Sequence, residues 1–490
     1  MHYIIIGGGV AGLSAAIALG KRGEEVDLYE KESHVGGLCT NWSRPPYTFN
    51  GCMHWLLGSS SGTSFYDMWN SIIDIDKLDF IYHEVRMEMP VRARNARGEY
   101  AAFRLFSDAE RLRSHLIENA PEDSTLINRF VNAVCMASKH LNVLPPLWNK
   151  GVFGNFRQAL TMTSMLTVLD IVRYFGKFTT HTFSEQCVSE WLKEVFRRLY
   201  TTPTPMVAVV FSAAYANRGV AGYPIGGSAA LTHLMERSIP SNVHLHLSSP
   251  VTNIIVKRGK ATSVILEDGN EVSADHIVSA ADWYWTMNHI VVNGKPYEYK
   301  EPSLPLYHSY CTLNLGVHMP MDGEPHFQRL LLDEPLLSPD GTMYEEVELE
   351  VFNFDRSLTG GDTTRTCMTI NLPTHEGGFW IDLYRDNMQK YRKKKNILAG
   401  KLLQILSMHY GSEFAMSIEA AILATPATYH RFTNNHLGSS QGWQPSLNVV
   451  RQKGDVGMSV HDIKSLSLCG HWTMMGGGLP IAMRSGLLIP

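Results

Sequence analysis

The stretch Tyr3-Ile4-Ile5-Ile6-Gly7-Gly8-Gly9-Val10-Ala11-Gly12 decides the fold of this chain. An apolar β-rich run is followed by glycines spaced G-x-G-x-x-G, and the next seven residues predict a helix. In such a strand–turn–helix unit Gly7 permits the tight turn, Gly9 lets the backbone approach a pyrophosphate, and Gly12 lets the helix pack close to the sheet. Val10 and Ala11 open the helix, whose free N–H groups suit phosphates. We therefore expect a dinucleotide site here.

A second predicted strand, residues 25–29, ends at Glu30. A carboxylate at this place accepts hydrogen bonds from a ribose 2′-hydroxyl and favours a nucleotide without a 2′-phosphate. A glycine-rich turn without a ligand is the alternative interpretation. The strand, the glycines, the helix and the acidic residue stand in register, and this combination favours the nucleotide site.

Composition limits the class of protein. The chain has 490 residues, 44% of them apolar and 18% charged, which suits two or three domains with a large core. A net charge of −4 gives no reason to expect a nucleic-acid partner. We expect no signal peptide and no membrane-spanning segment. Seven cysteines without a C-x-x-C pair indicate reduced thiols rather than a disulfide frame or metal site, and predict a cytoplasmic protein.

A second diglycine follows Glu30 in the stretch Ser33-His34-Val35-Gly36-Gly37-Leu38-Cys39. It resembles the signature of FAD oxidoreductases of the glutathione-reductase and amine-oxidase type. The resemblance implies that Gly36 and Gly37 pack beside the pyrophosphate and ribityl chain of FAD, with Lys31 and Leu38 also at the cofactor. Leu38 stands where those families usually carry Arg or Lys, which removes one side-chain contact and leaves the backbone role.

A segment in the middle of the chain is also predicted to belong to the nucleotide domain. Tyr223-Pro224-x-Gly226-Gly227, a predicted hairpin around Asp268-Gly269, and Ala280-Ala281-Asp282 resemble the second FAD segment of phytoene desaturases, carotenoid isomerases and retinol saturases. The resemblance implies that the backbone at Val251 meets the adenine and that Ala281 lies at the cofactor. A hairpin without a ligand is the alternative for this segment taken alone.

The last segment is Gly470-His471-Trp472-Thr473-Met474-Met475-Gly476-Gly477-Gly478-Leu479-Pro480. It resembles the C-terminal glycine-rich element of the same desaturase-like family. The resemblance implies that Gly470 and His471 lie by the ribityl chain and pyrophosphate, and that Gly477, Gly478 and Leu479 carry the backbone under the isoalloxazine. A helix N-terminus beyond them would stabilise negative charge on reduced flavin. A plain glycine-rich loop is the alternative.

Two further blocks supply candidates for proton handling. Tyr47–Gly58 and Ala424–Thr433 each resemble a block of the family, and the resemblance implies that the second lines the pocket facing the flavin. His54 and Tyr429 are the catalytic candidates, with ordinary structural side chains as the alternative. Asn50 and Cys52 depart from the family pattern, which usually has an acid and a glycine there.

We expect an α/β protein whose Rossmann-like FAD-binding domain is built from residues 1–74, 211–295 and 455–490. An inserted α+β substrate or cap domain, residues 75–210 and 296–454, would combine a mixed or antiparallel sheet with a helical lobe near 107–210. Ser107 to Glu110 has capping-box spacing and predicts the start of a helix. The apolar run Phe156–Phe178 is interpreted as core, ahead of a ligand-adapted stripe or a membrane-surface helix.

The resemblance implies an FAD-dependent oxidoreductase that desaturates, saturates or isomerises carbon–carbon bonds of an apolar isoprenoid, polyene or lipid-like substrate. An amine-oxidase-type enzyme and a non-enzymatic prenyl-binding escort protein are the alternatives. The sequence has no second G-x-G-x-x-G unit, so we expect no separate NAD(P)H domain. Transient use of NAD(P)H at the flavin stays open. Peripheral membrane contact is compatible with such a substrate, and the sequence does not address the oligomeric state.

Overall fold

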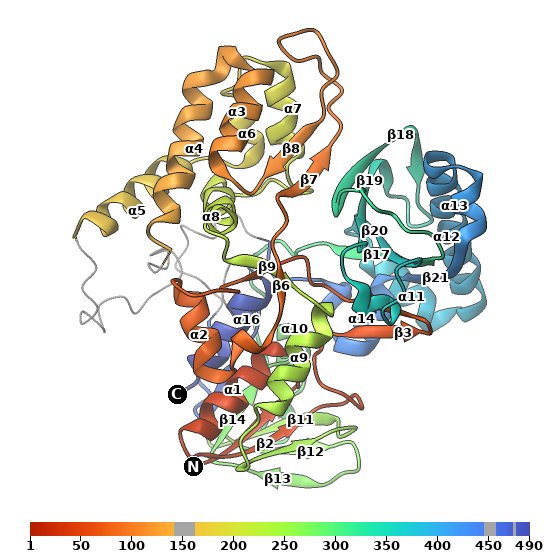
Figure 1. Ribbon diagram of the computed structural model, residues 1–490. Helices are drawn as coiled ribbons and strands as arrows, with labels where there is room; N and C mark the ends of the chain where they lie inside the picture. The colour runs from red at the N-terminus through yellow and green to blue at the C-terminus, as the bar shows by residue number, and fades with distance from the viewer. Residues whose placement is uncertain (142–161, 445–456, 474–476) are drawn as a thin grey trace.

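A five-stranded parallel sheet forms the centre of the lower domain in Figure 1. The computed structural model describes residues 1–141, 162–444, 457–473 and 477–490. Neighbouring strands of this sheet all run parallel. In sheet order they are β10 (Val243–His246), β2 (Glu25–Tyr29), β1 (His2–Ile6), β14 (His276–Ser279) and β22 (Leu466–Leu468). The strands come from three separate parts of the chain, and the predicted α/β, Rossmann-like class is confirmed.

The two faces of β1 pack against different layers. Tyr3 and Ile5 belong to the core that includes α1 (Val10–Lys21), whereas Ile4 and Ile6 belong to the core shared with a second sheet. Successive side chains of a strand point to opposite faces, so an uninterrupted apolar run suits a sheet covered on both sides. The helices beside α1 are α2 (Ser64–Ile72), α9 (Gly227–Arg237) and α16 (Gly478–Leu487).

The second sheet of this domain is built around a hairpin. Its strands, in order, are β13 (Glu271–Ser273), β12 (Lys260–Leu266), β11 (Val251–Lys257), β15 (Ile290–Val292) and β16 (Lys295–Pro296). The short helix α10 (Trp283–Asn288) follows β14 directly. Two small sheets lead towards the upper domains: the hairpin β3 (Asn41–Arg44) and β4 (Tyr47–Asn50), and the three-stranded sheet β5 (Leu56–Leu57), β9 (Ala221–Pro224) and β6 (Phe80–Ile81).

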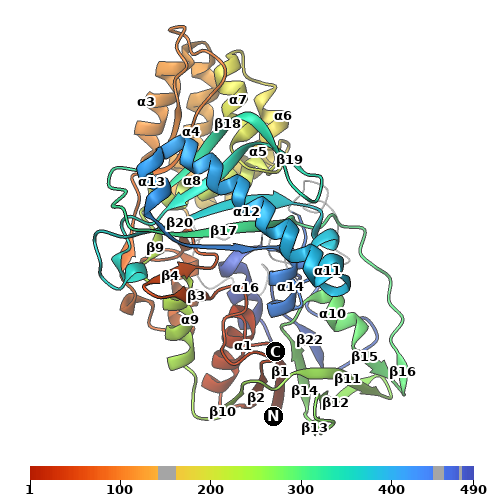
Figure 2. The same cartoon turned by 90° about the vertical axis from the view of Figure 1, so that its right-hand side faces the viewer.

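A seven-stranded mixed sheet forms the second body of the molecule, and in Figure 2 it lies behind the long helix α12. Its strands, in order, are β21 (Ile418–Ala424), β17 (Ser309–Val317), β20 (Thr366–Thr374), β19 (Met343–Val351), β18 (Phe327–Leu337), β7 (Val85–Met89) and β8 (Phe103–Phe106). The helices α11 (Gly377–Asp386), α12 (Met388–Tyr410), α13 (Ser412–Ser417) and α14 (Pro426–Thr433) follow its later strands. Leu398, Leu402 and Leu406 recur every turn of α12 and are fully buried, so this stripe holds the helix to the sheet.

A helical lobe stands above the nucleotide domain (Figure 1). It contains α3 (Ala109–Asn119), α4 (Ser124–Ser138), α5 (Met162–Phe175), α6 (Thr180–Ser184), α7 (Glu190–Arg198) and α8 (Met206–Asn217). The predicted cap at Ser107 is wrong by one residue. Asp108 accepts the hydrogen bond from Arg111 N, because the Ser107 hydroxyl donates instead to the His83 carbonyl.

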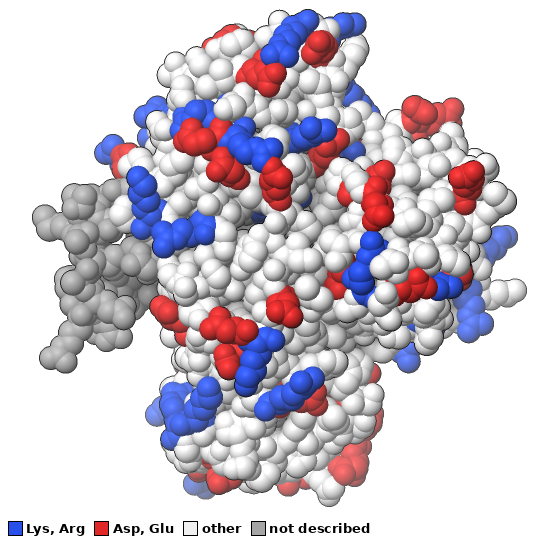
Figure 3. All heavy atoms as spheres, in the orientation of Figure 1, with Lys and Arg blue, Asp and Glu red and all other residues white. Residues whose placement is uncertain are grey.

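The apolar run at residues 156–178 falls partly outside the described residues, since Phe156 and Leu160 are not among them. Of the described side chains, Val168, Ile171 and Phe175 are buried and belong to the main core. This part of the run is core, as interpreted from the sequence. No helix among the described residues is long and apolar enough to cross a membrane. On the face in Figure 3, basic and acidic side chains are interspersed.

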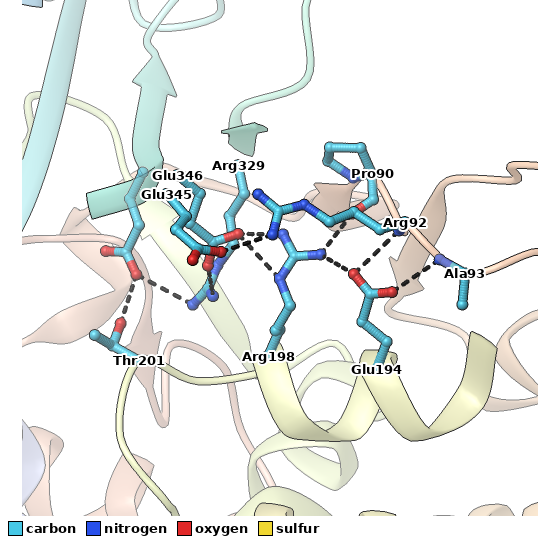
Figure 4. Close-up of polar contacts among 10 residues, drawn as sticks. Pro90, Arg92, Ala93, Glu194, Arg198, Thr201, Arg329, Glu345 and Glu346 are labelled. Atoms are coloured by element: carbon cyan, nitrogen blue, oxygen red, sulfur yellow. Dashed lines mark hydrogen bonds and ion pairs between the residues drawn. The ribbon is translucent and has the colours of Figure 1, made fainter. Parts of the chain in front are cut away.

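An ionic network joins the helical lobe to the seven-stranded sheet (Figure 4). Arg198 of α7 pairs with Glu194 on its own helix and with Glu346 of β19. Arg329 of β18, whose side chain is 4% exposed, pairs with Glu346 at 2.8 Å and with Glu348 at 3.1 Å. Glu346 therefore neutralises two guanidinium groups at once. This shared carboxylate fixes how the lobe sits on the sheet.

Candidate functional site

The first glycine loop lies at the carboxyl end of β1, where parallel α/β sheets bind their ligands. Gly7 adopts φ +99°, a conformation that favours glycine, and its N–H donates to the Tyr29 carbonyl at 2.8 Å. The N–H of Gly8 donates to Oε2 of Glu30 at 2.7 Å. The loop and the end of β2 are thus tied together, and α1 begins directly after Gly9.

Gly9 and Gly12 are needed for different reasons. A Cβ on Gly12 would lie 1.9 Å from the Gly7 carbonyl oxygen and 3.2 Å from Cβ of Ala280, so the helix and turn pack with no room for a side chain. A Cβ on Gly9 would meet no protein atom within 4 Å. Its φ of −71° suits any residue. Gly9 therefore borders open space at the N-terminus of α1, where Val10 and Ala11 present the first helical N–H groups.

Glu30 is 8% exposed and holds the loop together with both carboxylate oxygens. Besides Gly8, it accepts the N–H of Glu32 at 2.9 Å. Each oxygen keeps a further lone pair with which to accept a hydroxyl. Lys31 points elsewhere, because its ammonium donates to the Arg431 carbonyl and to Asn434 Oδ1. In this structure Lys31 therefore connects the nucleotide domain to α14.

The second diglycine packs against the first loop. Gly36 N donates to the Gly8 carbonyl at 2.9 Å, and a Cβ on Gly37 would lie 3.4 Å from the Gly9 Cα. Both residues have positive φ, at +126° and +60°. A Cβ on Gly36 would come within 2.6 Å of the Cys39 carbonyl. Leu38 is half-buried beside them. The two glycine loops form one backbone surface.

The C-terminal segment reaches the same place through β22, the edge strand beside β14. Gly470 has φ +114°, and its N–H donates to Ser485 Oγ of α16 at 2.7 Å. The helix α16 starts after Gly477, and Gly478 and Leu479 form its first turn. Gly486 was not predicted from the sequence. A Cβ there would lie 2.4 Å from the Ala11 carbonyl, so α16 packs backbone-to-backbone against α1.

The middle segment completes the surface. The N–H of Ala280 donates to the Ile6 carbonyl at 2.9 Å, which places Ala281 just past the end of β14 and next to Gly7. Val251 is buried at the start of β11 in the core shared with the parallel sheet. Asp282 ends the Ala280-Ala281-Asp282 motif that was singled out in the sequence, but its structural role was not predicted. It caps α10 through Trp285 N and accepts His436 N at 2.8 Å, and burial raises its pKa to about 6.

The residues at this surface fit a dinucleotide cofactor. Nε2 of His471 is buried and has no hydrogen-bond partner among the described residues. Burial lowers the pKa of His471 to about 4, so the ring is neutral and can bond a ribityl hydroxyl. The space beside Gly9 gives the phosphates room at a helix N-terminus. The groups that would hold the cofactor are the two glycine loops, Glu30, and the turn from Gly470 to His471.

His54 lies on the loop after β4 and forms an ion pair with the sheet. Its Nδ1 is 3.1 Å from Oε2 of Glu350, a carboxylate that is 2% exposed. Burial opposes protonation of the ring, but Glu350, supported by Cys52 and Glu348, outweighs it and raises the pKa of His54 to about 9. His54 is therefore a cation at neutral pH. Its side chain stays 41% exposed.

Tyr429 is connected to His54 through three strands of the sheet. Its hydroxyl donates to Thr312 Oγ1 at 2.8 Å, and Thr312 donates to Asn371 Oδ1 at 3.1 Å. The Asn371 amide donates to Oε1 of Glu350 at 2.8 Å. Burial raises the pKa of Tyr429, so its hydroxyl stays protonated. The sequence did not predict Glu350, Asn371 or Thr312, since only strand register brings them together.

A cavity of about 480 Å³ opens beside His54. Aromatic and histidine side chains make up most of its wall, together with one arginine, Arg86. The lining residues are His54, Trp55, Tyr82, His83, Arg86, Ser107, Ala216, Ala221, Tyr223, His326 and Phe327.

Known proteins resemble this chain in sequence and in fold. Residues 5–72 match the NAD(P)-binding Rossmann-like domain family. Prolycopene isomerase 2 of an Oncidium hybrid is 24% identical across 99% of this chain and 82% of that protein. The 4,4'-diapophytoene desaturase of Methylomonas is 22% identical across 99% and 93%. An inactive all-trans-retinol 13,14-reductase of Danio rerio is 22% identical across 59% of this chain and 49% of that protein.

Solved structures agree on the fold. An oxidoreductase from Methanosarcina mazei superposes with a TM-score of 0.58 at 14% identity, covering 99% of both chains. Putrescine oxidase bound to putrescine superposes with a TM-score of 0.57 at 14% identity, covering 99% of this chain and 98% of that one. Fold and site thus define an α/β protein with a Rossmann-type dinucleotide site. The chain is a homologue of carotenoid isomerases and desaturases.

Proposed function

We propose that this protein is an FAD-dependent oxidoreductase that desaturates, saturates or isomerises carbon–carbon bonds of an apolar isoprenoid, polyene or lipid-like substrate. The carrying observation is the convergence of three distant chain segments on one backbone surface. There Gly9 borders open space, Gly36 bonds to the first loop, and α16 packs on α1 through Gly486. The names of the relatives support the reaction class, because prolycopene isomerisation and 4,4'-diapophytoene desaturation both change carbon–carbon bonds.

When bound, FAD would supply the exchange of a hydride or an electron pair with the substrate. The chain would orient the substrate and hold a proton. Protonated His54 keeps its Nδ1 proton on Glu350, so Nε2 is the atom that can donate a hydrogen bond or a proton into the cavity. Tyr429 would act as a neutral hydroxyl. An amide does not readily pass protons along a chain, so Asn371 orients its neighbours.

The charge of the cavity argues against the amine-oxidase alternative. A protonated amine needs carboxylates or an aromatic cage without competing cations. None of the lining side chains is acidic, and Arg86 contributes a positive charge, whereas the charge of His54 is balanced by Glu350. The prenyl-binding alternative shares the fold with the enzymes and predicts a protein without flavin.

The test is an absorption spectrum of the purified protein, recorded anaerobically before and after NADPH or NADH. A flavin band that NADPH bleaches would support a saturase using NAD(P)H as a transient donor. A band that persists would support a desaturase or isomerase with another acceptor. A colourless protein that takes up no added FAD would refute the enzyme proposal and leave the binding protein.

The proposal includes a cytoplasmic location with peripheral membrane contact, because an apolar substrate of this kind partitions into bilayers. Flotation of the protein with phosphatidylcholine vesicles tests this part. A protein that stays at the bottom of the gradient at all lipid concentrations would contradict it.

A further inference from the structure

Arg86 lies between two cavities. It lines the cavity beside His54 and also a second one of about 390 Å³ inside the helical lobe. Nearly every other residue of the second cavity is apolar, among them Phe103, Leu112 and Phe196. The guanidinium therefore marks the boundary between a mixed aromatic space and an apolar one.

The charge of Arg86 has no carboxylate to balance it. Among the described residues Arg86 forms no ion pair, and its polar contacts are two long ones to Ser212, at 3.5 Å to the carbonyl and 3.4 Å to Oγ. Its Cζ lies 4.4 Å from the centre of the Trp55 ring. Burial lowers the pKa of Arg86, and Tyr200 opposes this shift only in part.

The neighbouring cation, His54, differs from Arg86 because it has a carboxylate partner. Glu350 neutralises His54, and none of the residues that line the cavity is Asp or Glu. The positive charge of Arg86 is thus the one that no carboxylate of the described cavity wall balances. A half-buried guanidinium without an acid is costly, and stacking on Trp55 offsets only part of that cost. Its planar fork matches a carboxylate, and one leftover charge matches a monoanion better than a phosphate monoester.

We propose that the substrate carries a carboxylate, which Arg86 binds, on an otherwise apolar unsaturated chain that lies beside Trp55 and His54. This rests on the proposed function and narrows its substrate class from neutral hydrocarbons to isoprenoid or lipid acids. Arg86 is then a specificity-determining residue that holds the acid end.

The test compares farnesoic acid with methyl farnesoate and farnesyl phosphate, which share one isoprenoid chain. Isothermal titration calorimetry on the purified full chain measures the three affinities. We expect the acid to bind at least tenfold more tightly than the ester or the phosphate. Equal affinity for acid and ester overturns the proposal, and tighter binding of the phosphate overturns the assignment to carboxylates. Because the measurement has no redox readout, its failure is distinct from a failure of the flavin test.

Arg86→Met removes the charge and keeps an apolar stem. We expect it to weaken farnesoic acid binding about tenfold and to leave methyl farnesoate within twofold. Arg94→Met is the matched control, because Arg94 also stacks on an aromatic ring, Tyr100 at 4.6 Å, but lines neither cavity. If Arg86→Met weakens acid and ester equally, the residue has only a structural role. The comparison of ligands on the unmodified protein stands even where this variant does not fold.

Discussion

His54 and Tyr429 are the two ends of one hydrogen-bonded chain, although one precedes the cap-domain strands and the other follows them. Between them stand Glu350, Asn371 and Thr312, each on a different strand of the seven-stranded sheet. Every donor in the chain points towards the Glu350 carboxylate. The arrangement therefore holds one buried negative charge and fixes the position of both terminal side chains.

Thr312→Val breaks the chain at its middle without a large change of shape. We expect it to lower the free energy of unfolding by about 1–3 kcal/mol, because the buried Asn371 oxygen and the Tyr429 hydroxyl lose their partner. Thr312→Ser keeps the hydroxyl, and we expect it to cost less. Urea denaturation of both variants measures this. A valine variant as stable as the serine variant would show that the chain contributes nothing.

Glu350→Gln removes the charge that keeps His54 protonated. A group whose pKa is raised on folding, here from 6.5 to about 9, stabilises the protein below pH 6.5 and loses that contribution as the pH rises through 9. The melting temperature of the unmodified protein, compared with that of His54→Asn, should therefore fall between these pH values. In the Glu350→Gln background we expect the difference to vanish.

The control for this prediction is another histidine–glutamate pair. His244 and Glu25 lie 3.7 Å apart with side chains 59% and 63% exposed, so solvent screens their interaction. Glu25→Gln should leave the pH dependence attributed to His54 unchanged. A similar loss in both variants would mean that the effect comes from net charge rather than from the buried pair.

Gly9→Ala and Gly12→Ala separate cofactor binding from folding. The Gly9 methyl group would project into open space, so we expect an unchanged melting temperature for the cofactor-free protein and a loss of bound flavin. The Gly12 methyl group would strike the Gly7 carbonyl, so that variant should lose stability as well. Flavin absorbance per protein and thermal unfolding distinguish the two. Full flavin content in Gly9→Ala would remove this loop from the proposed site.

The parts of the site that depend on local geometry could be predicted from the sequence. Gly7 and Gly470 stand directly after strands in the turns predicted for them, because positive φ and close backbone approach leave glycine as the residue of choice. The sequence signals for the start of a helix were less reliable, because the N-cap predicted at Ser107 is Asp108 in the structure. The boundaries of the domains and the roles of the individual cofactor residues stay predictions.

The parts that depend on tertiary contacts could not be predicted. In the sequence Glu350 is one of several glutamates in a strand whose pattern predicts exposure. Only the packing of the His54 loop buries it as the partner of the imidazole. The sequence gives Gly486 no role beyond that of a glycine in a helix. In the structure its missing side chain allows α16 to pack closely against α1. Arg86 alternates with apolar neighbours in an ordinary strand, and only the cavities distinguish it.

Glu346 and its neighbour Glu345 test whether the ionic network holds the helical lobe. Glu346→Gln leaves Arg198 and the buried Arg329 short of one shared carboxylate, and we expect a loss of about 3–5 kcal/mol in unfolding free energy. Within the described part of the chain Glu345 pairs with Arg92 alone, at side-chain exposures of 65% and 50%, so Glu345→Gln should cost less than about 1 kcal/mol. Both substitutions remove one negative charge from the same strand, and they differ in burial and in the number of arginine partners. Chemical denaturation at low and high salt measures the two losses. Equal losses that both shrink in salt would show that the network is a surface feature, with the lobe held by apolar packing alone.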